Sequence, residues 1–296
     1  MQIETSHLNK IFFPNENITK GDILEYYEAV AEYMLPFLRN RIVVLHRFPD
    51  GVQAENFYQK EASDYFPNFI KRVKVKTKGA GTQEFPVIEN KESLIYLANL
   101  GTITFHIWLS QIDKLNYPDK LIFDIDPPDG KMFEDVKFTA FKLKGLLDSR
   151  NLKSFPMLTG SKGLHVVVPL DQSTNFETVH EYAKSNATKL ADEYPDKLTI
   201  EQRINKRKER VFIDYLRNSF GQNAVAPFSV RARPGASVAV PIEWEELESS
   251  NIKSNSYTIK NVFERLSEKH NPWKDFFKTT YSISRNHFKT PLSSPT

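Results

Sequence analysis

The sequence predicts a mixed α/β fold. Strands and helices alternate through the middle of the chain, and further strands and turns flank this part on both sides. This order indicates a mixed core rather than a regular doubly wound sheet. The alternating elements are a strand at Lys120–Asp126, a helix at Phe133–Asp148, a strand at Leu164–Leu170, a helix at Phe176–Tyr194 and a strand at Arg210–Tyr215.

The outer elements carry recognisable start and stop signals. Thr19, with Asp22 three residues later, predicts the start of a helix that continues to Leu38. No segment has the composition of a linker, so we expect one domain over residues 1–290 and a disordered tail at 291–296. The remaining expected elements are strands at Arg41–Phe48 and Ile103–Trp108, a helix at Lys91–Leu100 that Gly101 ends, and a terminal helix at Tyr257–His270.

Composition restricts the class of protein. An apolar fraction of 40% with 26% charged residues is typical of a globular protein. There is no apolar run of transmembrane length and no apolar core of a secretory signal, so we expect a cytoplasmic location and no membrane partner. The absence of cysteine excludes disulfides, a thiolate nucleophile and cysteine-ligated zinc.

The net charge of +3 neither demands nor excludes a nucleic-acid partner, so the distribution of charge matters more. Two segments are strongly basic: KRVKVKTKGAG from Lys71 and RINKRKER from Arg203. The first alternates basic and apolar residues, as a strand with one basic face would. Either segment is also compatible with a plain solvated surface.

Two carboxylates stand at the end of an apolar strand in KLIFDIDPPDG, where Pro127 and Pro128 stop the strand. Residues two apart on a strand point to the same side, so Asp124 and Asp126 are expected to face together. Their repulsion raises one pKa unless a cation compensates it, and divalent magnesium or manganese is the natural compensator. A polar turn is the structural alternative, since Asp-Pro is a common turn former.

A third carboxylate also stands at the end of an apolar run. Asp214 ends the apolar run Val211–Ile213 in RVFIDYLRN. Two such strands side by side would bring Asp124, Asp126 and Asp214 to one rim. Three carboxylates can hold two divalent ions about 3.5–4 Å apart, as in phosphoryl-transfer sites.

A glycine-containing turn, LTGSKGLHVVVPL, lies between the two acidic strands and leads into a strand. Its glycines allow backbone N–H groups to approach an anion, and its polar residues add hydroxyl, ammonium and imidazole groups. The spacing and the following strand differ from those of a P-loop, and an ordinary hairpin turn has the same appearance. The residues concerned are Thr159, Ser161, Lys162 and His165.

A pair of arginines lies further along in SVRARPGA. As alternate residues of a strand, Arg231 and Arg233 would face one way and suit a triphosphate or nucleic-acid phosphates. The alternative is an exposed strand face with salt bridges.

These motifs together resemble the archaeo-eukaryotic primase superfamily, and more narrowly the polymerase domain of bacterial DNA ligase D. The three superfamily motifs are FDID, SKGLH and FID in this chain. The resemblance extends over most of the sequence, including NKIFFP, ITKGDILEYY, RFPDG, FYQKEA, FHIWLS and PFSVRARPGASVAVPIEW. It implies an α+β primase-like core with central, mainly antiparallel sheets flanked by helices.

The resemblance also implies a role for each matching residue. Asp124, Asp126 and Asp214 would hold two divalent ions, Mn²⁺ or Mg²⁺. The incoming nucleotide would be held by Thr159, Ser161, Lys162, His165, Arg231 and Arg233, with His106 near its sugar and Phe57 and Lys60 near its base and the template. Lys10 and Lys20 would bind the 5′-phosphate of a DNA break. The family usually has serine at the position of Thr159 and glycine at that of Ser161, and both changes keep or add a hydroxyl group.

The implied activity is template-directed nucleotidyl transfer at gapped or broken DNA ends during end-joining repair. The substrates would be nucleoside triphosphates, with ribonucleotides preferred to deoxynucleotides, and the ion would be manganese or magnesium. The resemblance names the end-binding protein Ku and a DNA ligase as candidate partners, and a nucleoid-associated location. No ligase or phosphoesterase segment is recognised, as expected of a stand-alone polymerase or an excised domain.

Two other functions fit parts of the sequence. A phosphatase-like hydrolase would use Asp124 as nucleophile and Asp126 as acid and base, but such enzymes usually have Thr or Val where Pro128 stands, and Asp214 has no place in them. A non-catalytic DNA-end-binding module would give the carboxylates only structural roles.

Overall fold

The computed structural model describes residues 3–77, 81–128, 133–269 and 271–288. The described chain forms two compact units. The first takes in the described residues within Met1–Asp113, Asn223–Val240 and Asn255–His270, and the second those within Lys114–Gln222, Pro241–Ser254 and Asn271–Thr296. The expectation of a single domain stays a prediction, and the expected tail at 291–296 lies outside the described residues.

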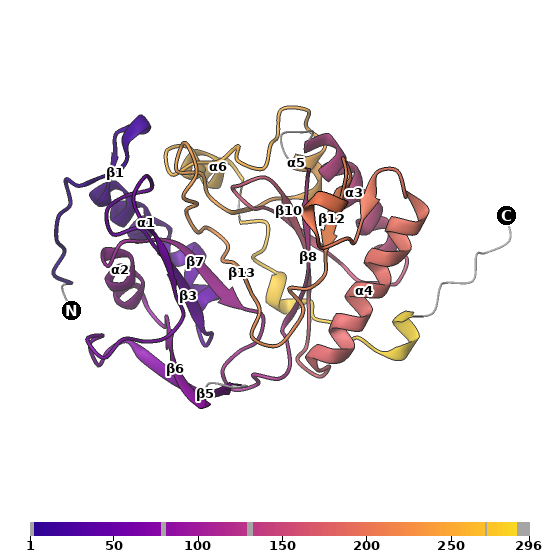
Figure 1. The fold of residues 1–296 in the computed structure, drawn as a ribbon, viewed down its shortest axis with the longest axis horizontal. Coiled ribbons are helices and arrows are strands. Elements are labelled where there is room, and N and C mark those ends of the chain that lie inside the picture. Colours follow the sequence, from indigo (N-terminus) through magenta and orange to yellow (C-terminus); the bar gives the residue numbers. More distant parts are fainter. Residues whose placement is uncertain (1–2, 78–80, 129–132, 270, 289–296) are drawn as a thin grey trace, which may run out of the picture. The chain divides into compact units, whose positions relative to one another are not determined.

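The first unit is built on a four-stranded sheet with the order β13-β7-β3-β4, whose neighbours are all antiparallel. The helices α1 and α2 pack against each other, and α2 also contacts β7 (Figure 1). The strands are β3 (Val43–Arg47), β4 (Phe57–Gln59), β7 (Thr102–Trp108) and β13 (Asn223–Val225). The helices are α1 (Lys20–Leu38), α2 (Lys91–Asn99) and α6 (Val262–Glu268), with hairpins β1 (Ile11–Phe13) to β2 (Ile18–Thr19) and β5 (Lys71–Thr77) to β6 (Gly81–Val87) and a 3₁₀ turn at Pro14–Glu16.

The second unit contains the six-stranded sheet, ordered β11-β12-β8-β10-β9-β14. The strands are β8 (Lys120–Asp126), β9 (Phe155–Leu158), β10 (Leu164–Pro169), β11 (Leu198–Thr199), β12 (Val211–Asp214) and the two-residue β14 (Val240–Pro241). The helices α3 (Phe133–Asp148) and α4 (Phe176–Glu193) pack together and both contact β8 (Figure 1). Shorter pieces are α5 (Trp244–Leu247) and 3₁₀ turns at Ile204–Lys206, Phe276–Lys278 and Arg285–Phe288.

The predicted fold class is confirmed. The sheets are mainly antiparallel and carry helices, and the β11–β12 pair is parallel. The bounds of β8 and α3 agree with the sequence prediction, and Thr19 and Asp22 form the expected capping box of α1. Among the described helices, none combines the length and the apolar character that crossing a membrane requires.

The predicted terminal helix at Tyr257–His270 is wrong over its first turn. The helix α6 covers only Val262–Glu268. Thr258 pairs instead with Ser237 in an isolated bridge, and its N–H donates to Asn261 Oδ1. The apolar spacing used for the prediction therefore holds for Val262 and Leu266, while the preceding residues satisfy their backbone groups outside the helix.

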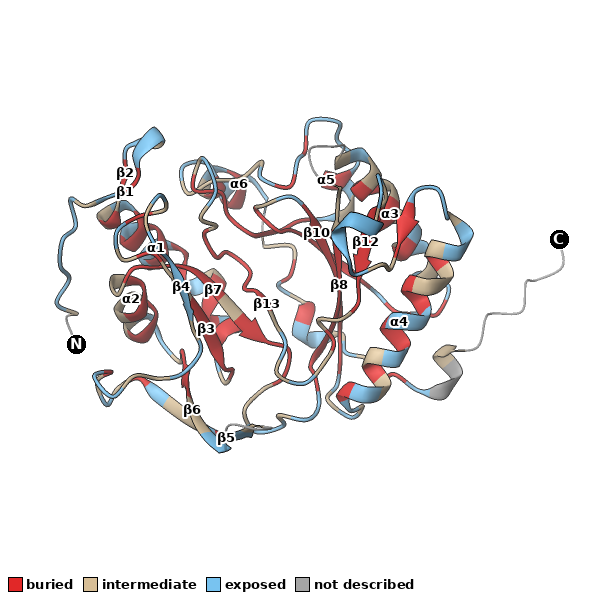
Figure 2. Ribbon diagram, in the orientation of Figure 1, coloured by how far each residue is buried: buried red, intermediate tan, exposed pale blue. Residues whose placement is uncertain are grey.

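Both central strands of the second unit are buried along almost their whole length, as Figure 2 shows for β8 and β10. Strands that are buried on both faces have continuous apolar runs, which explains LIF in β8 and VVV in β10. Asp124 lies within this buried strand and is only 6% exposed. The fold therefore places a carboxylate where a charge is costly unless it is compensated.

Asn218 connects the segment after β12 to β8. Its side chain is fully buried, its Oδ1 accepts from Ile122 N at 2.8 Å, and its Nδ2 donates to Ile122 O and Tyr215 O at 2.7 and 2.8 Å. The amide thus satisfies three backbone groups that would otherwise lack partners. It fixes the chain three to four residues after Asp214 against the middle of β8.

Replacement of this amide should destabilise the protein. We expect Asn218→Ala to lower the free energy of unfolding by about 2–3 kcal/mol, because it leaves three buried backbone groups unsatisfied. Equilibrium urea unfolding in EDTA measures the change. The exposed Asn205, changed to alanine, is the matched control. Equal stability of the two variants would contradict the role given to Asn218.

Candidate active site

The second unit brings the three predicted aspartates together. The strands β12 and β8 pair in antiparallel fashion with Asp214 directly opposite Asp124, and Asp126 follows two residues later on the same face of β8. These strands lie side by side in Figure 1. The sequence interpretation that two neighbouring strands each deliver carboxylates is therefore confirmed by the register.

Burial and mutual repulsion control the charge of these carboxylates. Burial, followed by the charges of Asp124 and Asp214, raises the pKa of Asp126 to about 7. Burial and then the charge of Asp124 also raise the pKa of Asp214. Desolvation and neighbouring carboxylates both disfavour ionisation, as in other clusters of acids. The cluster therefore lacks enough internal positive charge to keep all three groups fully ionised at neutral pH.

Arg217 is the basic residue that partly compensates this charge, and the sequence analysis missed it. Its Nε lies 3.5 Å from Asp124 Oδ2 and 3.5 Å from Asp214 Oδ2. Burial alone would lower the pKa of Arg217, but the three aspartates raise it. The available signal was its position in RVFIDYLRN, three residues after a carboxylate that needs a counter-charge.

His165 is the second positively chargeable neighbour of Asp124. It lies on β10 directly opposite Asp124 on β8, and its Nε2 is 3.4 Å from Asp124 Oδ1. Its Nδ1 is buried and has no hydrogen-bond partner among the described residues. An imidazole in this position can donate to an oxygen of a ligand.

The glycine-containing turn is the loop of the β9–β10 hairpin, as one of the two sequence readings expected. Thr159 Oγ1 donates to Gly163 O at 2.9 Å, and Gly160 N donates to Ser254 O at 2.9 Å. Ser254 Oγ in turn donates to Ser161 O at 2.7 Å. The buried Thr159 hydroxyl and the Gly160 N–H therefore stabilise the loop, while Ser161 is half-buried and Lys162 is exposed near its tip.

Gly163 is needed for a different reason from the one the sequence suggested. A Cβ at this position would lie 2.3 Å from Ile125 O and 3.0 Å from Asp126 Oδ1. Both distances are shorter than atoms normally approach. The absence of a side chain at Gly163 thus allows β10 to lie against β8 beside Asp126.

The carboxylate oxygens of the three aspartates are of the chemical type that binds a divalent cation. Carboxylate oxygens are the ligands of magnesium and manganese, and burial together with the charges of Asp124 and Asp214 raises the pKa of Asp126, which a bound cation would offset. Among the described residues, however, no group of three or more His, Asp or Glu side chains forms a ready-made metal site. The carboxylates of Asp124 and Asp214 are instead arranged around Arg217.

In the first unit, His106 lies in β7 opposite Val44 of β3, and its ring centroid is 5.8 Å from that of Tyr58. Tyr58 stacks on His46 at 4.0 Å with an interplanar angle of 14°. The neighbouring Phe57 is exposed and has the Arg47 guanidinium 5.2 Å from its ring centroid. Lys60 is exposed just after β4. His106 and the segment that carries Phe57 are therefore neighbours.

The interpretation of Arg231 and Arg233 as alternate residues of one strand is wrong. Val230 makes only an isolated bridge, to Val238, and Arg233 N donates to Arg231 O at 2.8 Å in a tight turn. The following Pro-Gly pair ends any extended backbone, since Gly235 has φ of 83°. The two arginines thus lie at the start of a turn rather than on the face of a sheet.

Lys10 and Lys20 are close neighbours with different environments. Lys20 is only 5% exposed, and its Nζ donates to Ser6 O at 2.7 Å. Burial, and then the charge of Lys10, lower the pKa of Lys20. Lys10 Nζ donates to Pro49 O at 2.9 Å and pairs with Asp50. Lys20 is therefore a buried lysine with an internal partner rather than a solvated surface residue.

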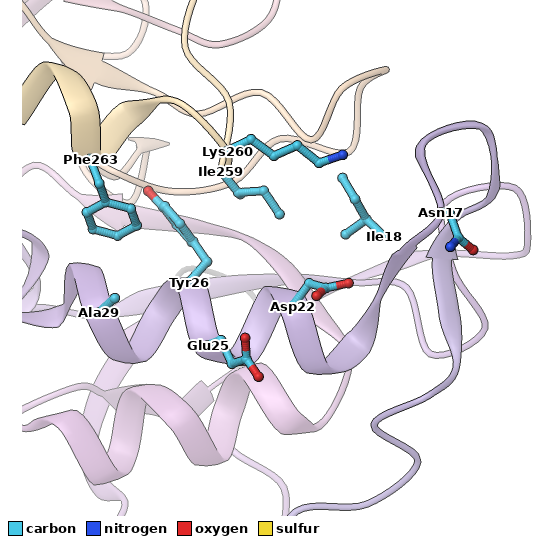
Figure 3. A pocket seen from close by; sticks show the side chains of 9 residues that line it. All are labelled: Asn17, Ile18, Asp22, Glu25, Tyr26, Ala29, Ile259, Lys260 and Phe263. Carbon is cyan, nitrogen blue, oxygen red and sulfur yellow. The ribbon is translucent and has the colours of Figure 1, made fainter.

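A cavity of about 440 Å³ lies in the first unit between α1 and the segment that leads into α6 (Figure 3). None of the predicted site residues lines it. Two of its polar groups are already used by the fold, since Asp22 caps α1 and the Tyr26 hydroxyl donates to Phe228 O. The residues that line it are Asn17, Ile18, Asp22, Glu25, Tyr26, Ala29, Ile259, Lys260 and Phe263.

The contact at Gly163 gives a direct test of the packing. We expect Gly163→Ala to reduce the free energy of unfolding by about 1–3 kcal/mol, because the new methyl group overlaps Ile125 O. Chemical denaturation measures this loss. Gly145→Ala is the control: Gly145 is an exposed position of α3 with nothing within 4 Å of a new Cβ, where alanine should stabilise by about 0.5–1 kcal/mol. A neutral Gly163→Ala would refute the close approach.

The raised pKa of Asp126 predicts a dependence of stability on pH. Between its ordinary value of 3.8 and about 7, the folded protein retains a proton that the unfolded chain has lost. Stability therefore falls as pH rises through this window, by at most about 4 kcal/mol. Asp126→Asn should remove this fall in metal-free protein, whereas the exposed Asp192→Asn should keep it. Thermal unfolding in EDTA from pH 5 to pH 8 measures the difference, and parallel curves for wild type and Asp126→Asn would contradict the prediction.

Comparison with known proteins agrees with this geometry. Residues 19–273 match the family described as "LigD, primase-polymerase domain". The chain is 32% identical over 294 residues to the bifunctional non-homologous end joining protein LigD of Bacillus subtilis, and 32% identical over 289 residues to the multifunctional LigD of Pseudomonas aeruginosa. These matches cover 99% and 95% of this chain but only 46% and 34% of the relatives, so the chain spans less than half the length of either.

The fold also matches a solved structure. The polymerase domain from Mycobacterium tuberculosis ligase D, determined in complex with DNA, superposes with a TM-score of 0.87 and 26% sequence identity. The match covers 95% of this chain and 99% of that domain. Sequence and structure therefore agree over nearly the whole chain, which belongs to the family of LigD primase-polymerase domains.

Proposed function

We propose that this chain is a template-directed nucleotidyltransferase that adds nucleotides to 3′ ends at DNA breaks or gaps. The observation that carries the proposal is the pairing of Asp214 opposite Asp124, with Asp126 on the same face of β8. Family membership supports the reaction type, and the LigD relatives, which are named as non-homologous end joining proteins, support the biological setting. The neighbouring structure in complex with DNA supports DNA as a substrate.

In the second unit, we assign Asp124, Asp126 and Asp214 to binding two divalent cations, manganese or magnesium. When bound, such ions activate the primer hydroxyl and neutralise the charge of the triphosphate. His165 lies beside Asp124 with a buried Nδ1 that can donate to a phosphate oxygen. Ser161 and Lys162, near the tip of the hairpin, provide a hydroxyl and an ammonium group to the same triphosphate. Thr159 is assigned to the same phosphate-binding turn, and its hydroxyl donates to Gly163 O across the loop.

In the first unit, we assign His106 to the sugar of the incoming nucleotide, and Phe57 and Lys60 to its base and the template. Arg231 and Arg233 would neutralise its phosphates from a turn rather than from a strand. Lys10 and Lys20 would bind the 5′-phosphate at a DNA break. Lys20 suits this role because its ammonium donates to the carbonyl and the hydroxyl of Ser6, both uncharged, and gains favourable charge interactions on meeting an anion.

The reaction would join the primer 3′ oxygen to the α-phosphorus and release pyrophosphate. The protein residues hold the two reactants in line and neutralise charge on the non-bridging oxygens. The proton of the 3′-hydroxyl would pass to solvent as the oxygen attacks. A preference for ribonucleotides and for manganese, and cooperation with Ku and a DNA ligase, are further parts of this proposal.

Primer extension tests the proposal. We expect Asp124→Ala and Asp214→Ala to reduce incorporation on a 5′-phosphorylated gapped duplex by at least about a hundredfold, because each removes ligands for the ions that stabilise the transition state. DNA binding should be retained. The exposed Asp192→Ala is the control and should extend like the wild type. Reactions with ribo- and deoxynucleotides, each with manganese and with magnesium, test the finer preferences.

The same assay separates the alternatives. Release of phosphate without incorporation would indicate the phosphatase-like hydrolase, and DNA binding without any turnover would indicate an end-binding module. Unchanged incorporation by Asp124→Ala would remove the basis of the proposed site. Family membership favours the polymerase over both alternatives.

A further inference from the structure

Arg217 stands where a cation would be expected. Its Nε is 3.5 Å from one carboxylate oxygen of Asp124 and 3.5 Å from one of Asp214, which places positive charge between two of the three aspartates. The sequence motifs do not assign Arg217, and none of the roles proposed above uses it. Its position raises the question of what happens to this guanidinium when a divalent ion binds.

The backbone that carries Arg217 is fixed, but its side chain is not enclosed. Leu216 N donates to Asp214 Oδ1 at 2.8 Å, and the buried Asn218 makes three hydrogen bonds to Ile122 and Tyr215. The Arg217 side chain remains 38% exposed. A long, partly exposed side chain on a fixed backbone can move into solvent without disturbing the strands.

The contacts of Arg217 Nε with the two aspartates are longer than those of a directly hydrogen-bonded ion pair. Bidentate arginine–carboxylate pairs have N–O distances of about 2.7–2.9 Å. Here Nε approaches to only 3.5 Å and makes no hydrogen bond of normal geometry among the described residues. The Nε contacts therefore compensate charge from beyond ordinary hydrogen-bond length, and a divalent ion with the same carboxylate ligands would compete with them directly.

We propose that Arg217 is an internal counter-ion that stabilises the carboxylate pair Asp124–Asp214 in the metal-free protein and is displaced when a divalent cation binds. The inference rests on the metal role given to these aspartates in the proposed function. It assigns Arg217 as a positioning residue that sets the affinity for the ion. It also explains how a buried cluster of acids remains folded before the ion arrives.

Binding of Mn²⁺ to the whole chain tests the proposal without measuring catalysis. Free Mn²⁺, quantified by its electron paramagnetic resonance signal, gives the dissociation constant. We expect Arg217→Gln to bind Mn²⁺ about tenfold more tightly than the wild type, equivalent to about 1.4 kcal/mol, because the competing charge is gone. Arg203→Gln removes an equal charge from an exposed position of the same unit and should leave the affinity within about twofold. Equal or weaker binding by Arg217→Gln overturns the proposal.

Stability provides a second measurement. In EDTA, the melting temperature of Arg217→Gln should fall below that of the wild type, because Asp124 and Asp214 lose their compensation. Saturating Mn²⁺ should remove this difference, since the ion then supplies the charge in both proteins. A deficit that persists unchanged with Mn²⁺ would show that Arg217 has an ordinary structural role, and would overturn the proposal.

Displacement can be observed in the wild-type protein, so the test does not depend on the variant folding. The Nε–Hε resonance of Arg217, assigned by comparison with Arg217→Lys, should shift on addition of Mg²⁺ and exchange faster with water. An Arg217 resonance that is insensitive to saturating Mg²⁺ overturns the proposal. If the wild type extends primers and binds Mn²⁺ but Arg217 does not respond, only this inference fails. If the wild type binds no divalent ion, the proposed function fails with it.

Discussion

The second unit depends on compensating three carboxylates that its central strands bring together. The register of β12 on β8 places Asp214 opposite Asp124. Left alone, these charges would oppose the pairing that produces them. Arg217 supplies a counter-charge to both residues, and Asn218 holds the segment that carries Arg217 against β8. Protonation of Asp126, whose pKa is about 7, removes part of the remaining repulsion. Arg217 and the protonation of Asp126 thus partly compensate the charges that the pairing of these strands brings together.

The same principle applies to the basic residues of the first unit. Lys10 is paired with Asp50, and the buried Lys20 donates to the carbonyl of Ser6. In each case a group that the proposed function assigns to an external ligand already has a partner within the chain. Such partners lower the cost of a buried charge in the free protein, and a ligand must then exchange with them rather than enter an unsatisfied site. Under the proposed function, the affinity of these two lysines for a phosphate would be the difference between their external and internal interactions.

The sequence pattern predicted those structural features that depend on residues close together in the chain. The apolar runs that end in Asp124 and Asp214, the capping box at Thr19 and the bounds of α3 all follow from residues close in the chain. Among features fixed by distant contacts, the pairing of the strands that carry Asp124 and Asp214 was predicted, and others were missed or wrong. Arg217 comes close to Asp124 only when β12 lies beside β8. Arg231 and Arg233 have strand-like alternation, yet backbone bonds to Ser237 and within the turn decide their conformation. The predicted start of the helix at Tyr257 was wrong for the same reason, because Thr258 forms a bridge with Ser237.

The bonds between Asn218 and Ile122 have a consequence for the order of folding. They join residues 96 positions apart, so a long loop must close before the site exists. A chain emerging from the ribosome would complete β8 well before Asn218 and Arg217 are available to it. Until then, Asp124 and Asp126 lack this counter-charge. Assembly of the carboxylate cluster is therefore expected to be a late and cooperative event, and a fragment that ends at β10 would lack both Asp214 and the residues that make its charge tolerable.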